Sequence, residues 1–224
     1  MYVSLGSDCV IKKRLEEYCI GPNQISHIFD WVLSDLTAVC FMLKNPDTIS
    51  EDKFDIITRT NEGFYVIKHK ECYFVSLHDA PVTLSEYDAK MLVVDKYKRR
   101  LKRMTDLIQK CTIEFITIND RFNPIYDGKK SIDTDDICKF FGVINEINPF
   151  NEHQITVITD SPENIEIISS RVKVIDSKEF LDLETMTTDW YRFFLNWEEI
   201  FTQIKAPISA LKYTRDRGVQ VEIP

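Results

Sequence analysis

The second half of the chain alternates short apolar runs with segments of helical periodicity, and this alternation limits the fold more than any other feature. Residues 113–118, 155–158 and 172–175 are rich in β-branched side chains and predict strands, whereas 134–146 and 163–169 predict helices. Strands separated by helices are typical of βαβ units with parallel strands. The pattern therefore predicts an α/β fold with a mainly parallel, Rossmann-like or flavodoxin-like sheet.

The rest of the chain supplies elements that flank such a sheet. Ser7 and Ser34 are the predicted N-caps of the first two helices. Further strands are predicted at 2–5, 64–67, 72–77 and 218–223, and further helices at 7–18, 35–45, 85–110 and 190–204. The strands at 64–67 and 72–77 predict a β-hairpin insertion, and residues 123–134 a long surface loop. Because 224 residues can bury a sufficient core, we expect residues 1–224 to form a single domain.

Composition excludes several classes of function. The chain has 36 acidic and 28 basic residues and a net charge of −8, which argues against a general nucleic-acid binder. It has no apolar run long enough to span a membrane and no secretory signal at Met1, so a cytoplasmic location is expected. The six cysteines are widely spaced without a C-x-x-C pair, which favours free thiols over disulfides or zinc. No metal or cofactor is expected.

The segment Ser4-Leu-Gly-Ser-Asp-Cys9 is the first candidate site. A strand, a glycine turn and a helix start place Cys9 in the first helical turn, where backbone amides stabilise a thiolate. The same turn, formed by Gly6, Ser7 and Asp8, suits an oxyanion or a phosphate. The alternative is that Cys9 is a small buried residue and that Gly6 only makes the turn. Asp8 complicates a nucleophilic role, because a neighbouring negative charge raises a thiol pKa.

Three further residues could complete a catalytic site. His78 and Asp79 end a β-like run, so His78 could serve as a base and Asp79 could orient it. Asp30 lies between two aromatic residues in Phe29-Asp-Trp31, where an unpaired carboxylate is costly to bury. It is therefore either a cap at the entry to a helix or the partner of His78 or of an arginine.

The long predicted helix carries a basic stretch at residues 96–103. Its arginines, Arg99, Arg100 and Arg103, could bind phosphates or an acidic substrate. The alternative is that they form the solvated face of an amphipathic helix. His69 and His153 lie beside charged residues and are predicted to be exposed. The aromatic helix 190–204 predicts either core packing or a homodimer interface.

Taken together, Ser4-Leu-Gly-Ser-Asp-Cys9, Phe29-Asp-Trp31, His78-Asp79 and Lys96-Tyr-Lys-Arg-Arg-Leu-Lys-Arg103 resemble a family of large DNA viruses and bacteria. That family is labelled as papain-like cysteine peptidases, and the similarity covers about the first 120 residues. The resemblance implies Cys9 as nucleophile, His78 as base and Asp79 or Asp30 as polar partner. It also implies a papain-like α+β fold as the alternative to a parallel sheet, and host cytoplasm as the location if the protein is viral.

Three functions remain open from these patterns. The first is a peptidase-like cysteine hydrolase in which Cys9 attacks a carbonyl of an unknown peptide or small-molecule substrate. The second is a Rossmann-like transferase that binds a nucleotide or nucleotide sugar, although no G-x-G-x-x-G or P-loop is present. The third is a non-enzymatic interaction protein with the aromatic helix as its interface.

Overall fold

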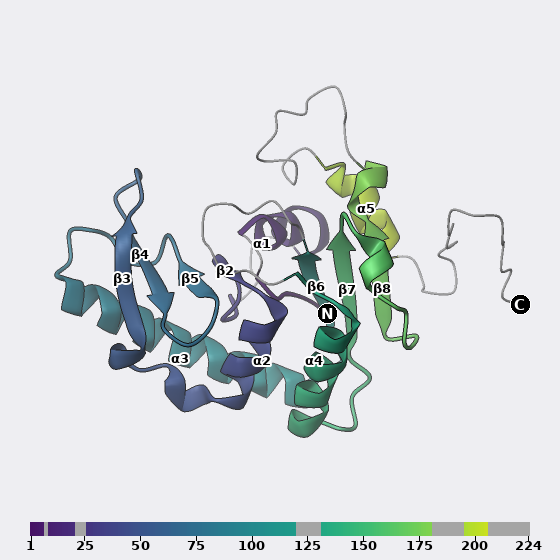
Figure 1. Cartoon of the computed structure of the whole chain (residues 1–224), viewed down its shortest axis with the longest axis horizontal. Coiled ribbons are helices and arrows are strands. Elements are labelled where there is room, and N and C mark those ends of the chain that lie inside the picture. The colour runs from purple at the N-terminus through teal and green to yellow at the C-terminus, as the bar shows by residue number, and fades with distance from the viewer. Residues whose placement is uncertain (7–8, 21–25, 120–130, 181–194, 206–224) are drawn as a thin grey trace, which may run out of the picture.

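Two four-stranded sheets lie side by side in the computed structural model, which describes residues 1–6, 9–20, 26–119, 131–180 and 195–205 (Figure 1). One sheet is parallel, with β1 (Tyr2–Ser4), β6 (Glu114–Asn119), β7 (Gln154–Thr159) and β8 (Val172–Asp176) in that order. The predicted α/β fold with a mainly parallel sheet is confirmed at this level.

The second sheet is antiparallel and is larger than the predicted hairpin. Its order is β2 (Val32–Ser34), β5 (Phe74–Ser76), β4 (Tyr65–His69) and β3 (Phe54–Arg59). The pairing of β4 with β5 is the hairpin that the sequence predicts, whereas β2 and β3 were not predicted. The strand β3 has a weak signal because most of its side chains are exposed or half-buried.

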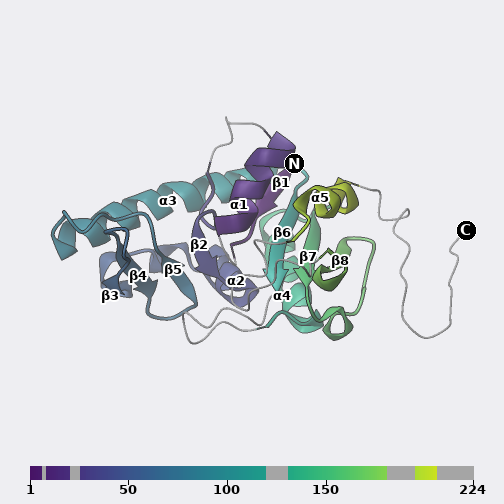
Figure 2. The same ribbon diagram turned by 90° about the horizontal axis from the view of Figure 1, so that it is seen from above.

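Helices cover both faces of the parallel sheet (Figure 2). Alternate strand residues point to opposite faces, so Ile116 and Ile118 pack with α1 (Cys9–Leu15) and α5 (Trp197–Lys205). Phe115 on the other face packs with α4 (Thr134–Ile147), α2 (Leu36–Lys44) and the long α3 (Glu86–Lys110). This second apolar cluster also includes residues of the antiparallel sheet, so both sheets share one continuous core.

The predicted helices are confirmed where apolar residues recur at helical spacing over several turns. The expected apolar stripe of α3, formed by Tyr97, Leu101, Met104 and Ile108, is buried, and Ser85 caps the helix through the amide of Asp88. In α5, the side chains of Trp197, Ile200, Phe201 and Ile204 are buried within the same chain.

Two local predictions are wrong. Asp35, not Ser34, caps α2, because its carboxylate accepts from the amide of Ala38 at 2.7 Å. The helix expected at 163–169 is only a 3₁₀ turn, Pro162–Asn164, since so short a segment lacks the length for a stable helical stripe. Several predicted features lie outside the described residues: the roles of Ser7 and Asp8, most of the loop 123–134, residues 190–194 and the strand 218–223.

Helix α1 passes directly into a π-helical turn, Glu16–Ile20. π-helical turns are uncommon and occur frequently at functional sites. Among the described residues, no helix combines the length and the apolar composition needed to cross a membrane.

Candidate functional site

The turn after β1 can hold only glycine at its first position. Gly6 has a φ of +84°, and a Cβ atom there would lie 1.9 Å from Oγ of Ser34. That hydroxyl donates to the carbonyl of Leu5 at 2.9 Å. The turn is thereby fixed against β2, and α1 begins three residues later at Cys9, as the sequence predicts. The side chain of Cys9 is outside the described part of the structure.

The segment 27–31, which precedes β2, meets this turn. The carbonyl oxygen of Phe29 lies 3.3 Å from the position that a Cβ atom on Gly6 would take. Within the segment, Oδ2 of Asp30 accepts from the amide of His27 at 2.7 Å. Trp31 adopts a φ of +66°, which a side chain of this size rarely does and which is common at functional sites.

The segment 27–31 also contacts α1. Oδ2 of Asp30 lies 3.3 Å from Nζ of Lys12, and each side chain is 1% exposed. Lys12 lies in addition 3.4 Å from Glu16. Burial raises the pKa of Asp30, and the neighbouring Lys12 ammonium only partly offsets this effect. The sequence left open whether Asp30 is a helix-entry cap or the partner of His78 or of an arginine, and in the structure its ion-pair partner is instead a lysine, Lys12.

His27 is the residue of this site that sequence reasoning missed. Its side chain is 4% exposed, and neither ring nitrogen has a hydrogen-bond partner among the described residues. Burial lowers its pKa to about 4, and the charges of Lys12, Arg103 and Arg100 act in the same direction. The imidazole is therefore neutral at pH 7. Its position three residues before Asp30 was the only available sequence signal.

Arg100, on α3, adds a further positive charge near Lys12, His27 and Asp30, which together form the buried cluster of this site. It is 7% exposed, its guanidinium lies 5.9 Å from the centre of the Tyr97 ring, and its Nη1 has no hydrogen-bond partner within the described ranges. The prediction of a solvated basic face holds for Arg99 and Arg103, which are exposed, and is wrong for Arg100. Arg100 lies three residues after Tyr97 and one before Leu101, so it borders the buried stripe of the helix.

The predicted pair of His78 and Asp79 is arranged differently from the expectation. The carboxylate of Asp79 accepts hydrogen bonds from Ser76, Lys96 and Tyr97. Nδ1 of His78 instead lies 3.4 Å from Oε2 of Glu62, at the turn between β3 and β4. Asp79 therefore fastens α3 to the end of β5 and does not orient His78.

Both views place the β3–β4 hairpin at the far side of the antiparallel sheet from α1 (Figures 1 and 2). The contact of His78 with Glu62 thus draws its ring toward that hairpin. By contrast, the segment 27–31 touches the chain at Gly6 and at Lys12, three residues on either side of Cys9. His27 is a better candidate than His78 for a group near Cys9.

A contact between a thiol and an imidazole occurs elsewhere, between Cys72 and His69. Sγ of Cys72 is 3.4 Å from Nδ1 of His69, whose Nε2 is 3.1 Å from the carbonyl of Thr48. Burial raises the pKa of Cys72 to about 12, so this thiol is protonated and unreactive. His69 and His153, predicted to be exposed, are both fully buried.

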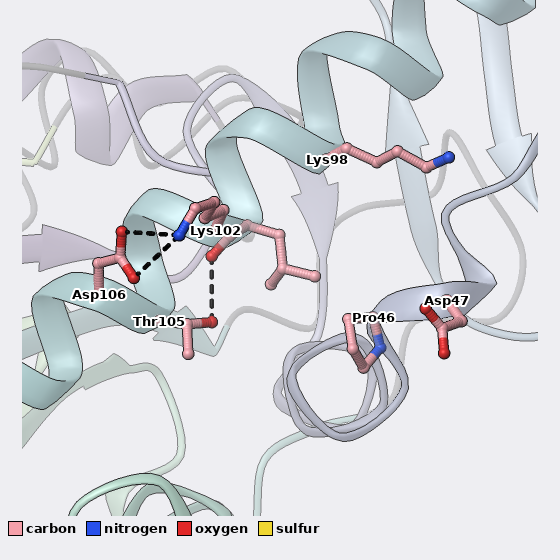
Figure 3. Close-up of a pocket in the computed structure, with 7 residues that line it drawn as sticks. Pro46, Asp47, Lys98, Lys102, Thr105 and Asp106 are labelled. Atoms are coloured by element: carbon pink, nitrogen blue, oxygen red, sulfur yellow. Dashed lines mark hydrogen bonds and ion pairs between the residues drawn. The ribbon is translucent and has the colours of Figure 1, made fainter.

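A surface hollow of about 390 Å³ lies between α3 and the turn after α2 (Figure 3). Lys98 and Lys102 extend from one wall and Asp47 from the other. Lys102 is paired with Asp106 on its own helix. The hollow contains none of the residues that the sequence singles out as catalytic.

No group of three or more His, Cys, Asp or Glu side chains suited to a metal ion occurs within the described residues. Comparison of the chain with protein-family models, curated proteins and solved structures finds no match in any of the three. The function of the site therefore has to be inferred from its own residues.

Proposed function

We propose that this protein is a thiol-dependent hydrolase with Cys9 as its nucleophile. The observation that carries the proposal is the position of the segment 27–31, which contacts the chain on both sides of Cys9 and lies among the positive charges of Lys12, Arg100 and Arg103. Cys9 itself opens α1 immediately after a turn that only glycine can make.

The charges of the cluster suggest how the thiol is activated. Lys12, Arg103 and Arg100 lower the pKa of His27, and positive charge lowers the pKa of a neighbouring thiol in the same way. Lys12 follows Cys9 by one helical turn and so shares its face of α1. A thiolate at Cys9 is then stabilised by fixed cations, without an ion pair to a protonated histidine.

The proposed reaction has two steps. The Cys9 thiolate forms a bond to the carbonyl carbon of an ester or amide, and the leaving group departs with a proton taken from solvent. Water then cleaves the thioester, which releases the acid and restores Cys9. His27 is neutral at pH 7 and can accept a hydrogen bond from that water.

We also propose that the parallel sheet is Rossmann-like and not part of a papain-like fold. In support, α1 follows β1 on one face of the sheet, whereas α4 follows β6 on the other. Adjacent parallel strands whose connections diverge in this way create a crevice at their carboxyl ends, where α/β proteins bind ligands. Gly6 and Asn119 lie at those two strand ends.

Alkylation of each cysteine by iodoacetamide, followed by mass spectrometry across pH, tests the proposal. We expect Cys9 to react roughly tenfold faster at pH 7 than the exposed Cys111 and Cys138, one pKa unit being a tenfold change in thiolate. Cys72 and Cys40, whose pKa values burial raises to about 12, supply slow references.

Matched variants locate the source of the reactivity. Arg103→Gln should slow the labelling of Cys9, whereas Arg99→Gln, an exposed arginine on the same helix, should not. His78→Ala should also leave the rate unchanged. A Cys9 that labels no faster than Cys111, or whose rate falls only in His78→Ala, would refute the proposed activation.

A further inference from the structure

Three nitrogen-bearing side chains from distant parts of the chain are buried around Asp30. Asp30 contacts Lys12 and accepts from the amide of His27, and the charge of Arg100 acts on the pKa values of both Asp30 and His27. Lys12 comes from α1, His27 from the segment before β2 and Arg100 from α3, and their side chains are 1%, 4% and 7% exposed. Such side chains are rarely buried without partners, because each loses its hydration. Lys12 has Asp30 and Glu16 as partners, so it is His27 and Arg100 whose burial calls for a compensating group.

The hydrogen bonds of this cluster are incomplete. Both ring nitrogens of His27 and Nη1 of Arg100 have no partner in the part of the chain that the structure describes. Most buried polar side-chain atoms in proteins have at least one. Lys173, also buried, follows this rule and donates to the carbonyl of Ile204 at 2.5 Å, whereas Nε of Arg14, Nε2 of His153 and Oγ of Ser177 each lack a partner within the described ranges. In these ranges, only around His27 and Arg100 do such atoms come from two cationic or basic side chains that act on each other's charge. The cluster therefore retains hydrogen-bonding capacity that the described residues do not use.

The ion pairs of the cluster are incomplete as well as its hydrogen bonds. Lys12 is shared between Asp30 and Glu16. Neither Arg100 nor Arg103 forms an ion pair with any residue in the described part of the chain, yet the charges of both reach His27. Lys12, Arg100 and Arg103 supply three positive charges against the two negative charges of Asp30 and Glu16, so the described cluster is positively charged in a protein whose net charge is −8.

One of the positive side chains that act on His27 lies at the surface. Arg103 follows Arg100 by one helical turn, so the two share a face of α3, and Arg103 is exposed. Arg103 therefore offers its charge to a ligand in solvent, one helical turn from the buried Arg100. Arginine suits this task because its planar guanidinium binds anionic oxygens in pairs.

We propose that Lys12, His27 and Arg100 bind a phosphate group of the substrate, with Arg103 at the entrance. A phosphate anion complements the positive charge of the cluster, and its oxygens can accept from Arg100 and from a neutral His27. This inference names the substrate class of the Cys9 site and rests on the proposed function for the reaction, but binding itself does not require the thiol.

Isothermal titration of the full-length Cys9→Ser protein with inorganic phosphate, at constant ionic strength set by chloride, measures this binding directly. We expect saturable binding that weakens by about tenfold in Arg103→Gln, the cost of one charge-assisted contact. Arg99→Gln, which removes an equal charge from the same helix, should leave the affinity unchanged. Arg103 and Arg99 are both exposed, so neither substitution threatens folding.

Three outcomes would overturn the inference. Phosphate could bind no better than chloride, Arg99→Gln could weaken binding as much as Arg103→Gln, or acetate could bind more tightly than phosphate. The two proposals also separate cleanly. Phosphate binding with a slow Cys9 supports the phosphate site and refutes the thiol hydrolase, whereas a fast Cys9 without phosphate binding does the reverse.

Discussion

Asp79 and Asp30 are both carboxylates with little exposure, and the charge of Arg100 on α3 acts on both, but their pKa values shift in opposite directions. Asp79 accepts hydrogen bonds from Ser76, Lys96 and Tyr97. Although burial opposes them, these bonds and the charges of Lys96 and Arg100 lower its pKa. Asp30 has Lys12 and one backbone amide as its partners, and burial raises its pKa.

The difference separates a structural network from a binding site. A buried polar group whose bonds are complete stabilises the fold, whereas one with unused capacity costs stability and persists where a ligand completes it. Around Asp79 the partners saturate the carboxylate. Around Asp30 the neighbouring His27 and Arg100 still have nitrogens without partners among the described residues. On this reasoning Asp79 belongs to the scaffold, and Asp30 to the site.

The largest expected change in stability comes from removing the charge of Asp79. Asp79→Asn should lower the free energy of unfolding by about 3 kcal/mol, because it leaves Lys96 without its anion and one of three hydrogen bonds without an acceptor. Urea denaturation measures the change. Glu62→Gln, which removes the exposed partner of His78, is the control and should cost less than about 0.5 kcal/mol. A loss below about 1 kcal/mol in Asp79→Asn would show that this network contributes little to the stability of the fold.

The next effect concerns the turn that presents Cys9. Gly6→Ala should destabilise the protein by about 2 kcal/mol or more, from the left-handed backbone and from the contact with Ser34. Gly63→Ala is a matched control, because Gly63 has the same φ of +84° but its nearest neighbour would lie 3.9 Å from the new Cβ. Thermal unfolding of both variants gives the contribution of the contact by difference. Equal losses would mean that Ser34 moves aside freely.

Most of the scaffold was predictable from local pattern. The strands β6, β7 and β8 are short apolar runs, and α3 carries a stripe of buried residues at helical spacing, so periodicity alone locates them. The strands β2 and β3 were not predictable in this way. β2 has only three residues, and the side chains of β3 are mostly outside the core.

The site was predicted only in part, because it depends on contacts between distant segments. Asp30 and Cys9 stood out by residue type and motif, but nothing in the sequence indicates that Lys12 would meet Asp30 from a different segment of the chain. His27 looked like a neighbour of the Phe29-Asp-Trp31 motif. His78 looked catalytic because it ends a β-like run, yet its position relative to Glu62 is set by the β3–β4 hairpin.

Because the ring nitrogens of His27 lack partners among the described residues, an apolar side chain at this position should make the protein more stable. His27→Leu should raise the free energy of unfolding at pH 7 by about 1 kcal/mol, since it removes a buried polar ring that lacks partners among the described residues. His153→Leu is the matched control and should lower it, because Nδ1 of His153 accepts from the amide of Ile113. Urea denaturation distinguishes the two signs. A loss of stability in His27→Leu would mean that the imidazole ring already has a hydrogen-bond partner in the folded protein.

The smallest expected effect is on the pH dependence of stability. The contributions of Asp79 and Asp30 to the free energy of unfolding should change in opposite directions as pH falls. The folded pKa of Asp79 is lowered, so its contribution is present above the unfolded pKa, near 4, and is lost as pH falls through the folded value. The folded pKa of Asp30 is raised, so its contribution is fullest below the unfolded pKa and is lost as pH rises through the folded value.

Asparagine does not titrate, so comparing wild type with Asp79→Asn or with Asp30→Asn measures the contribution of one carboxylate at a time. Between pH 6 and pH 3, the stability advantage of wild type over Asp79→Asn should shrink, whereas its advantage over Asp30→Asn should grow from a value below about 1 kcal/mol at pH 7. The neutral amide introduced by Asp30→Asn can still accept from the backbone N–H of His27, and Lys12 keeps Glu16, which is why the second variant loses so little. Urea titrations at a series of pH values measure both slopes. Slopes of the same sign would place Asp30 with the scaffold, and the cluster around Lys12, His27 and Arg100 would then lose its distinction from an ordinary buried ion pair.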